Sequence, residues 1–306
     1  MTEMKLTDKT AFIAIVGQPN VGKSSILNRL LGQKIAIVSS KPQTTRTRIM
    51  GVLTEGETQL VFTDTPGFHK PKTELGKFMV RAVSESVSNG DACLLVVEAG
   101  KEITKTEESL IEKFKSLKIP AILAINKIDT IKEKTELIRQ ITVYSNKMDW
   151  AAVVPVSAQD GSGLADLKEE LMNLAQEGGH FFDEDTLTDQ PEKVLAAEMI
   201  REKLLRLLDK EIPHGTAVVV EKMKTRPDTG LIDIEAIIFC ERETHKGIII
   251  GKRGDMLKKI GTFARQDMER FFECKVNLNV WVKVKEDWRN KGGLLRSFGF
   301  DEKTFK

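Results

Sequence analysis

The 306-residue sequence contains only three cysteines, one tyrosine and 6% aromatic residues, and it has no low-complexity tract. Cys93, Cys240 and Cys274 are scattered and odd in number, so they predict neither a disulfide framework nor a metal site. No apolar run approaches the roughly 18 residues that a membrane span needs, and the short run at Phe12–Val16 is badly flanked for a signal peptide. These absences argue against a secreted disulfide scaffold and an integral membrane protein, and they predict a cytoplasmic globular protein.

Charge is nearly balanced over the whole chain but unevenly distributed. Residues 1–184 contain 23 Lys and Arg against 24 Asp and Glu, whereas residues 246–306 contain 15 against 8. On charge alone, a solvated basic face is the simpler interpretation of the C-terminal excess. The excess is also typical of a segment that binds a polyanion.

Buried strands alternate with amphipathic helices over the first ~175 residues. Continuous apolar runs occur at Phe12–Val16, Gln59–Phe62, Ala92–Val97, Ala121–Ile125 and Val153–Val156. Helical patterns separate several of them, at Ser24–Leu31, Thr106–Leu117, Thr135–Lys147 and Leu164–Leu174. This alternation predicts an α/β domain with a mostly parallel sheet covered on both faces.

A glycine-containing, acidic segment ends this pattern and predicts a domain boundary. We place the first domain at residues 1–176, a linker at 177–191 and a second domain at 192–306. The second domain begins with a helix at Glu192–Asp209 and continues with strands at Thr216–Lys224 and Leu231–Cys240. A Gly-rich loop, a helix at Asp255–Phe272 and a strand at Lys275–Val284 follow, which together predict a small α+β domain.

The sequence GQPNVGKS directly follows the first strand and opens a helix, which is the GxxxxGK[ST] pattern of a P-loop. Glycines let successive backbone N–H groups point at phosphates, and the helix N-terminus adds its positive dipole end. Lys23 would reach the β- and γ-phosphates, and the Ser24 hydroxyl would bind Mg²⁺. The residues assigned to this loop are Gly17, Gln18, Pro19, Asn20, Val21, Gly22, Lys23 and Ser24.

The second predicted run, Gln59–Phe62, ends in TDTPG, which supplies a second part of the phosphate site. Asp64 is expected in the Mg²⁺ shell and the Gly67 N–H near the γ-phosphate, with Thr65 and Pro66 between them. Between this motif and the P-loop lies a polar loop, Ser39–Arg48, whose hydroxyls could complete the metal shell. Motif spacing favours Thr45, with Thr44 as the alternative. A loop of this kind is ordered by γ-phosphate and released after hydrolysis.

The run Ala121–Ile125 leads into NKID, which predicts the base. The Asp129 carboxylate can accept two hydrogen bonds from guanine N1–H and N2–H₂, and adenine lacks both donors. The aliphatic stem of Lys127 can cover the base. The nucleotide-binding residues beyond the P-loop and DTPG are Asn126, Lys127, Asp129, Ser157 and Ala158, the last two supplying N–H groups for guanine O6.

The second domain contains a GxxG loop with two basic residues at its centre. Such a loop, between two strands and a following helix and strand, is typical of a type II KH domain, which clamps about four single-stranded nucleotides. The predicted RNA-binding residues are Ile249, Ile250, Gly251, Lys252, Arg253, Gly254, Lys258 and Lys259. An inert appendage with a Gly-rich turn is the alternative interpretation.

The motif order GQPNVGKS, QTTR, DTPG, NKID and VSA resembles the small-GTPase fold of the translation-factor class, in its Era and MnmE/Der-like bacterial branch. A P-loop GTPase joined to a KH domain resembles the Era family over nearly the full length, including AAEMIREKLLRLL and WVKVKEDWR. The resemblance implies a GTPase that binds the 3′ end of 16S ribosomal RNA and assists maturation of the small (30S) ribosomal subunit. It also implies peripheral association with the inner membrane.

Hydrolysis is expected to be slow, because Phe68 stands where Ras-type enzymes place a water-orienting glutamine. His69 is a second candidate for that role, although its setting beside Lys70 is more typical of a surface loop. Resemblance to MnmE-like GTPases implies that Asn20 binds K⁺; a purely structural role in the turn is equally consistent with the residue. An alternative function is an RNA-binding scaffold in which GTP only sets the conformation and hydrolysis is incidental.

Overall fold

The structure, a computed structural model, describes residues 8–68 and 71–300. The chain forms two compact units. The first contains Met1–Ala36, Thr45–Lys70 and Met79–Asp189, and the second contains Ile37–Thr44, Pro71–Phe78 and Gln190–Lys306. His69 lies outside the described residues.

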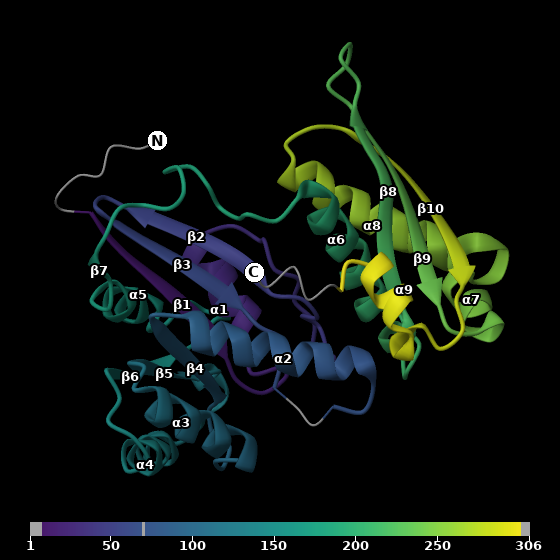
Figure 1. The fold of residues 1–306 in the computed structure, drawn as a ribbon. Helices are drawn as coiled ribbons and strands as arrows, with labels where there is room; N and C mark the ends of the chain where they lie inside the picture. The colour runs from purple at the N-terminus through teal and green to yellow at the C-terminus, as the bar shows by residue number, and fades with distance from the viewer. Residues whose placement is uncertain (1–7, 69–70, 301–306) are drawn as a thin grey trace. The chain divides into compact units, whose positions relative to one another are not determined.

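A sheet in the order β2-β3-β1-β4-β5-β6 forms the centre of the first unit (Figure 1). Its strands are β1 (Lys9–Val16), β2 (Ile49–Glu55), β3 (Thr58–Asp64), β4 (Ala92–Glu98), β5 (Ala121–Asn126) and β6 (Ala152–Val156). All neighbouring pairs are parallel except β2 with β3, which is antiparallel. The predicted mostly parallel sheet is therefore confirmed, with one edge strand, β2, that the apolar runs did not reveal.

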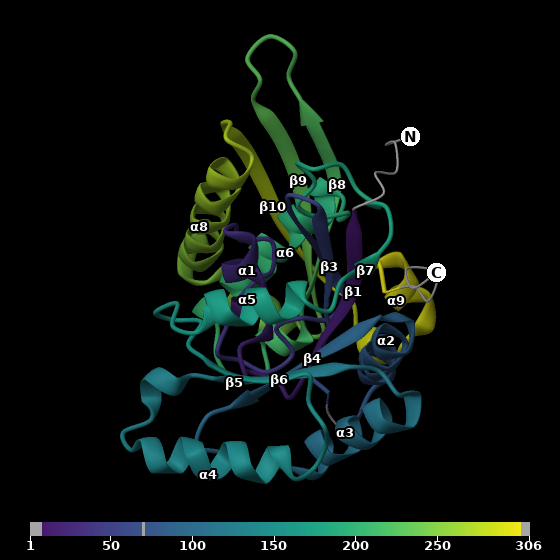
Figure 2. The same ribbon diagram turned by 90° about the vertical axis from the view of Figure 1, so that its left-hand side faces the viewer.

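Helices cover both faces of this sheet (Figure 2). They are α1 (Lys23–Leu31), α2 (Glu74–Asn89), α3 (Lys105–Leu117), α4 (Lys134–Ser145) and α5 (Leu164–Met172). Side chains of α2, α3 and α4 share one buried core with β1, β4 and β5, including Val83, Phe114 and Tyr144. The helices α1 and α5 contact each other and other parts of the sheet. The strands lie between these layers, which explains their unbroken apolar runs.

The segment predicted as a linker is fastened to the first unit. It begins with a short strand, β7 (Gln176–Glu177), paired antiparallel with the start of β1. The buried Gln59 side chain accepts from the N–H groups of Phe181 and Phe182 and donates to the Phe182 carbonyl. The Thr188 hydroxyl donates to the Met50 carbonyl at 2.6 Å. The units divide only after this anchor, between Asp189 and Gln190.

The second unit is a three-stranded sheet in the order β10-β9-β8, with α6 and α8 on one face and the short helix α9 on the other (Figure 1). Its elements are α6 (Glu192–Leu207), β8 (Ala217–Thr225), β9 (Ile232–Cys240), α7 (Glu243–Ile250), α8 (Asp255–Phe271), β10 (Val276–Val284) and α9 (Gly292–Ser297). The bounds predicted for its two helices and three strands agree with those of α6, β8, β9, α8 and β10 to within two residues. Two helices, α7 and α9, were not predicted, so the observed order is α-β-β-α-α-β with a short helix after it.

Charged residues of α6 hold the segment Ile37–Thr44 within the second unit. The buried Arg201 guanidinium donates to the carbonyls of Gln43 and Thr44. The Glu202 carboxylate, fully buried, accepts from the Val38 N–H at 3.2 Å and is paired with Lys203. This segment ends at the residue directly before Thr45.

The described part of the chain contains no helix long and apolar enough to cross a membrane.

Candidate functional site

The P-loop connects β1 to α1, and its backbone leaves no room for a side chain at Gly17 or Gly22. Gly17 and Gly22 have φ angles of +146° and +103°, and a Cβ on either would approach within 2.2 Å and 2.1 Å of the Val96 carbonyl oxygen and the Asn126 amide nitrogen. Asn20 also has positive φ, at 66°, which Asn tolerates better than most residues. The loop is therefore packed tightly against the ends of β4 and β5.

Lys23 lies inside this loop, where a phosphate chain would be cradled. Its ammonium group donates to the carbonyls of Gly17 and Gln18 at 3.2 and 2.9 Å, and the side chain is 6% exposed. Burial lowers the pKa of Lys23 to about 8, and the nearby Asp64 carboxylate opposes that shift. A polyphosphate would offer this ammonium group stronger partners than the two carbonyls.

The three predicted magnesium ligands converge on one point. The Ser24 hydroxyl donates to Asp64 Oδ2 at 2.6 Å, and the Thr45 hydroxyl donates to the same oxygen at 3.3 Å. The two hydroxyls are 3.0 Å apart. Asp64 is fully buried, and burial raises the pKa of its carboxyl group. Its second oxygen, Oδ1, has no hydrogen-bond partner among the described residues. This set of hard oxygen donors fits Mg²⁺.

The structure distinguishes the two threonines of the polar loop. Thr45 is 6% exposed and reaches the Ser24–Asp64 pair. The Thr44 hydroxyl instead donates to the Lys41 carbonyl at 2.6 Å and lies within the second unit. The geometry therefore favours Thr45 as the metal ligand.

The DTPG segment packs directly on the P-loop. A Cβ on Gly67 would come within 2.6 Å of the Pro19 backbone nitrogen, and the Phe68 N–H donates to the Gly17 carbonyl. The Thr65 hydroxyl donates to the Ile15 carbonyl at 2.8 Å. The ring of Phe68 packs against the core formed by α2, α3 and α4. The side chain in the glutamine position is therefore a packing group.

Asn126 of NKID links this motif to the P-loop and to the VSA segment. Its amide nitrogen donates to the Val21 carbonyl at 2.8 Å, and its oxygen accepts from the Ala158 N–H at 3.0 Å. The exposed Asp129 has one carboxylate oxygen bonded to the Ser157 hydroxyl at 2.6 Å. This contact orients the carboxylate and leaves its other oxygen for a ligand.

Lys127 and the VSA segment complete this region. Lys127 has a φ of 69° and its ammonium group is paired with Glu98 at 2.7 Å, which fixes its aliphatic stem. The Ser157 N–H donates to the Ser162 carbonyl, so both predicted O6 donors have protein partners here. Their proposed contact with guanine O6 remains a prediction.

The GxxG loop joins α7 to α8 and presents its two cations to solvent. Gly251, Arg253 and Gly254 all have positive φ, and a Cβ on Gly251 would lie 2.6 Å from Met256 Cβ. Lys252 and Arg253 are exposed. Exposed Lys258 and Lys259 follow on the first turns of α8.

One predicted RNA-contacting residue has a different role. Ile249 is fully buried in the core of the second unit, so it anchors α7 and cannot line an RNA groove. The neighbouring Ile248 is 49% exposed, and Phe263 of α8 is 40% exposed. Neither apolar side chain was predicted to contact RNA. Ile248 lies on α7, a helix that was not predicted, whereas Phe263 lies on the predicted helix α8.

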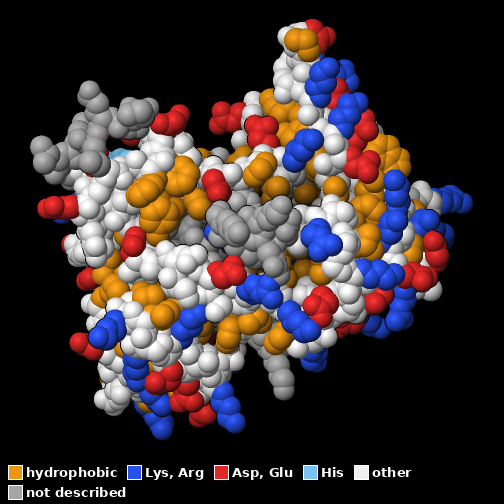
Figure 3. Space-filling view, viewed as in Figure 1, with side chains coloured by type: hydrophobic (Ala, Val, Ile, Leu, Met, Phe, Trp, Pro, Cys, Tyr) orange, Lys and Arg blue, Asp and Glu red, His pale blue; other side chains and the backbone are white. Residues whose placement is uncertain are grey.

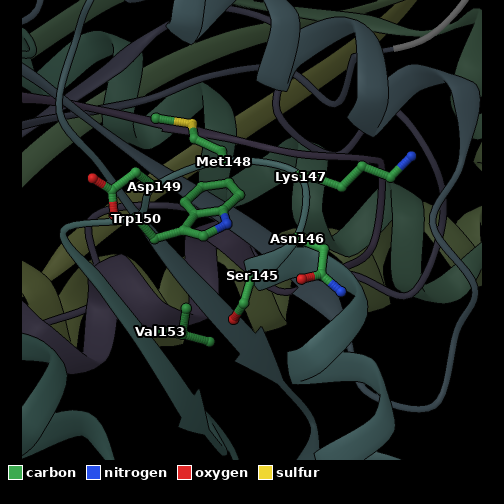
Figure 4. Close-up of a pocket in the computed structure, with 7 residues that line it drawn as sticks. All are labelled: Ser145, Asn146, Lys147, Met148, Asp149, Trp150 and Val153. Atoms are coloured by element: carbon green, nitrogen blue, oxygen red, sulfur yellow. The ribbon is translucent and has the colours of Figure 1, made fainter.

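A separate pocket lies at the end of α4, away from all these motifs (Figure 4). Figure 4 shows the ring of Trp150 beside Met148, with Asn146 and Lys147 on the turn that follows the helix. None of the predicted site residues lines it.

Two family models match the chain. Residues 12–127 match the model of the 50S ribosome-binding GTPases, and residues 211–289 match the KH domain. The first range begins before the P-loop and ends at Lys127, within NKID, and the second contains the GxxG loop.

Relatives and solved structures match nearly the whole chain. GTPase Era of Ruminiclostridium cellulolyticum is 50% identical over 292 residues, which are 95% of this chain and 97% of that protein. GTPase Era of Clostridioides difficile is 49% identical, covering 96% of this chain and 99% of that one. A variant of Aquifex aeolicus Era bound to GDP and AlF₄⁻ is 39% identical with a TM-score of 0.91, over 95% of this chain and 99% of that one. An Era structure in complex with MgGDPNP and nucleotides 1506–1542 of 16S ribosomal RNA gives the same identity and TM-score, over 96% and 99%. The chain therefore belongs to the Era family of GTPases.

Proposed function

We propose that this GTPase binds the single-stranded 3′ end of 16S ribosomal RNA through its KH domain and assists maturation of the small ribosomal subunit. The observation that carries the proposal is the exposed Lys252–Arg253 pair, held between two positive-φ glycines at the junction of α7 and α8. Backbone of this shape clamps single-stranded nucleotides, and its cations meet phosphates. The related Era structure contains nucleotides of that RNA.

The same proposal assigns roles for hydrolysis. When bound, Mg²⁺ neutralises charge on the β- and γ-phosphates. Ser24, Thr45 and Asp64, which meet in the structure, would hold it, and the Lys23 ammonium group would bind phosphate oxygens in place of the loop carbonyls. The Gly67 N–H senses the γ-phosphate. Phe68 cannot orient water, so catalysis depends on positioning and charge stabilisation.

Replacing both loop cations, Lys252→Asp with Arg253→Asp, will weaken binding of a 16S 3′-end RNA by about 100-fold near physiological salt, because two phosphate contacts become repulsive. The slope of log Kd against log salt will fall by about two, one unit for each lost contact. Fluorescence anisotropy of labelled RNA at several salt concentrations measures both.

The matched control is Lys132→Asp with Lys134→Asp, which removes two cations from the first unit and leaves the KH domain unchanged. GTP affinity is the second control, since it depends on a separate site. Unchanged RNA affinity in the loop variant would remove the KH clamp from the proposed function.

We also propose that Asn20 binds K⁺ beside the phosphates and so supplies charge that the Phe68 position does not. The positive φ of Asn20 satisfies the structural role as well, so the test must keep the backbone intact. Turnover in K⁺ will exceed turnover in Na⁺ by about 10-fold or more. Asn20→Gly retains the left-handed conformation without the side-chain oxygen, and it will abolish that difference while GTP binding persists. Equal rates in K⁺ and Na⁺ for the unaltered protein would contradict the proposal.

The site of action that we propose is the cytoplasm. All three cysteines are free thiols in the structure, as expected in a reducing compartment. The membrane association that the family resemblance implies would be peripheral, because no described helix can span the bilayer.

A further inference from the structure

The sheet of the second unit has one face on which α6, α7 and α8 do not pack, which we call the outer face. On β10 the side chains alternate, so Leu278, Val280 and Val282 pack into the core with the helices. The intervening residues Asn279, Trp281 and Lys283 are exposed on the outer face.

Trp281 is the most conspicuous residue of the outer face, because 47% of it is exposed. The other two tryptophans are held by hydrogen bonds from their ring N–H groups, Trp150 to the Tyr144 carbonyl and the fully buried Trp288 to the Gly215 carbonyl. Trp281 has no such bond to any residue that the structure describes. Its ring therefore offers an apolar surface and an unused donor to a ligand.

The C-terminal segment covers one end of the outer face and does not bury Trp281. Phe298 stacks on Phe239 of β9 with ring centroids 4.5 Å apart, and its ring also meets Trp288 edge-on. Trp281 pairs with Ile237, two residues before Phe239 on β9. The apolar surface thus continues past the covered end to an exposed aromatic ring.

Charge on the outer face favours a polyanion. The two acidic residues of β9 on this face are neutralised by ion pairs, Asp233 with Arg226 at 2.7 Å and Glu235 with Lys222 at 3.3 Å. Lys224 and Lys283 are exposed and form no ion pair with any described residue. Figure 3 shows Lys and Arg side chains beside apolar and acidic ones over this unit.

We propose that Trp281 stacks on a base of single-stranded RNA, outside the nucleotides that the GxxG loop clamps. The proposal rests on the RNA-binding function proposed above. β10 is an edge strand, and α7 and α8 pack against its other face. An RNA strand that leaves the GxxG loop along this edge can cross β10 and reach the outer face. Aromatic rings there bind bases of any sequence, and exposed lysines such as Lys283 meet the phosphates.

The test compares two RNA lengths taken from the same 16S 3′ end, about four and about ten nucleotides. Trp281→Ala will weaken binding of the longer RNA by about 10-fold or more and leave the shorter within about 2-fold. Trp281→Phe, which keeps an aromatic ring, will recover most of the loss, whereas Trp281→Leu, which keeps only apolar surface, will not. Leu117→Ala, at a 42% exposed residue of the first unit, is the matched control.

Salt dependence separates this site from the loop. Stacking releases no counterions, so Trp281→Ala will keep the salt slope of the parent protein, in contrast to the Lys252/Arg253 variant. In a Trp150→Phe background, the longer RNA will quench fluorescence, and Trp281→Phe added to it will remove the quenching.

Equal losses for both RNAs, or no loss for the longer one, would overturn the stacking site while leaving the RNA-binding function standing. Failure of the unaltered protein to bind either RNA would overturn both. A change of sedimentation coefficient in Trp281→Ala without RNA would assign the outer face to a second copy of the chain and so refute the proposal.

Discussion

Asp129→Asn will lower the affinity for GTP by at least about 100-fold, and it will raise the affinity for xanthosine triphosphate. The carboxylate is bonded to the Ser157 hydroxyl through one oxygen, which leaves the other to accept from guanine N1–H and N2–H₂. The amide oxygen can still accept from N1–H, but the amide N–H₂ group then faces the guanine N2–H₂ group, and two donors cannot pair. Xanthine has a carbonyl at position 2, so the amide can donate to it.

The matched control is Asp160→Asn in the neighbouring loop. Asp160 accepts from the Ser162 N–H at 2.8 Å and has no predicted contact with the base. Its substitution will change GTP affinity by no more than about 2-fold. Titration of both nucleotides by fluorescence or calorimetry measures the exchange of preference. A variant that still preferred GTP over xanthosine triphosphate would disprove the base assignment.

Thr45→Ala will reduce GTP hydrolysis by about 100-fold or more, and the adjacent Thr44→Ala will not. The two residues share a hydroxyl and a position in the same loop, but only Thr45 meets Ser24 and Asp64. The Thr44 hydroxyl caps the Lys41 carbonyl, and its loss removes an ordinary hydrogen bond worth about 1 kcal/mol.

Single-turnover hydrolysis at saturating GTP, over a range of Mg²⁺ concentrations, separates these effects. Thr45→Ala will require more Mg²⁺ for its half-maximal rate, whereas Thr44→Ala will follow the parent curve. GDP affinity serves as the control for folding, because GDP lacks the γ-phosphate. A larger loss in Thr44→Ala than in Thr45→Ala would reverse the assignment of the metal ligand.

The meeting of several motif residues could be predicted because their motifs stand at the ends of strands. The P-loop, DTPG, NKID and VSA motifs each follow a continuous apolar run, and the carboxyl ends of parallel strands meet at one edge of a sheet. Ser24 and Asp64 are consequently neighbours in space, although 40 residues separate them. The order of the motifs does not predict the acceptor of each hydrogen-bond donor. The Ala158 N–H, for example, donates to the Asn126 side chain.

The helices that the sequence did not predict, α7 and α9, are short, and the sequence of α7 is also unusual for a helix. The helix α7 has the sequence ETHKGIII, in which a glycine and three consecutive isoleucines hide the helical period. Without that helix, Ile249 and Ile248 could not be assigned to opposite faces, and the buried one was predicted to contact RNA. The contacts of the predicted linker could not be read from the sequence either. Its composition is typical of a boundary, but the buried Gln59 side chain supplies hydrogen bonds that composition does not reveal.

The boundary between Thr44 and Thr45 has a thermodynamic consequence. One peptide bond joins Thr44 to Thr45. The Thr44 carbonyl accepts a hydrogen bond from Arg201 of α6, and the Thr45 hydroxyl meets Ser24 and Asp64. A γ-phosphate that displaces Thr45 acts on a residue bonded directly to one that belongs to the KH-containing unit. If that displacement changes the affinity for RNA, RNA must change the affinity for GTP by the same factor, because the two binding free energies belong to one closed cycle. The ribosomal RNA would then act as an effector of the GTPase, as much as GTP acts as an effector of RNA binding.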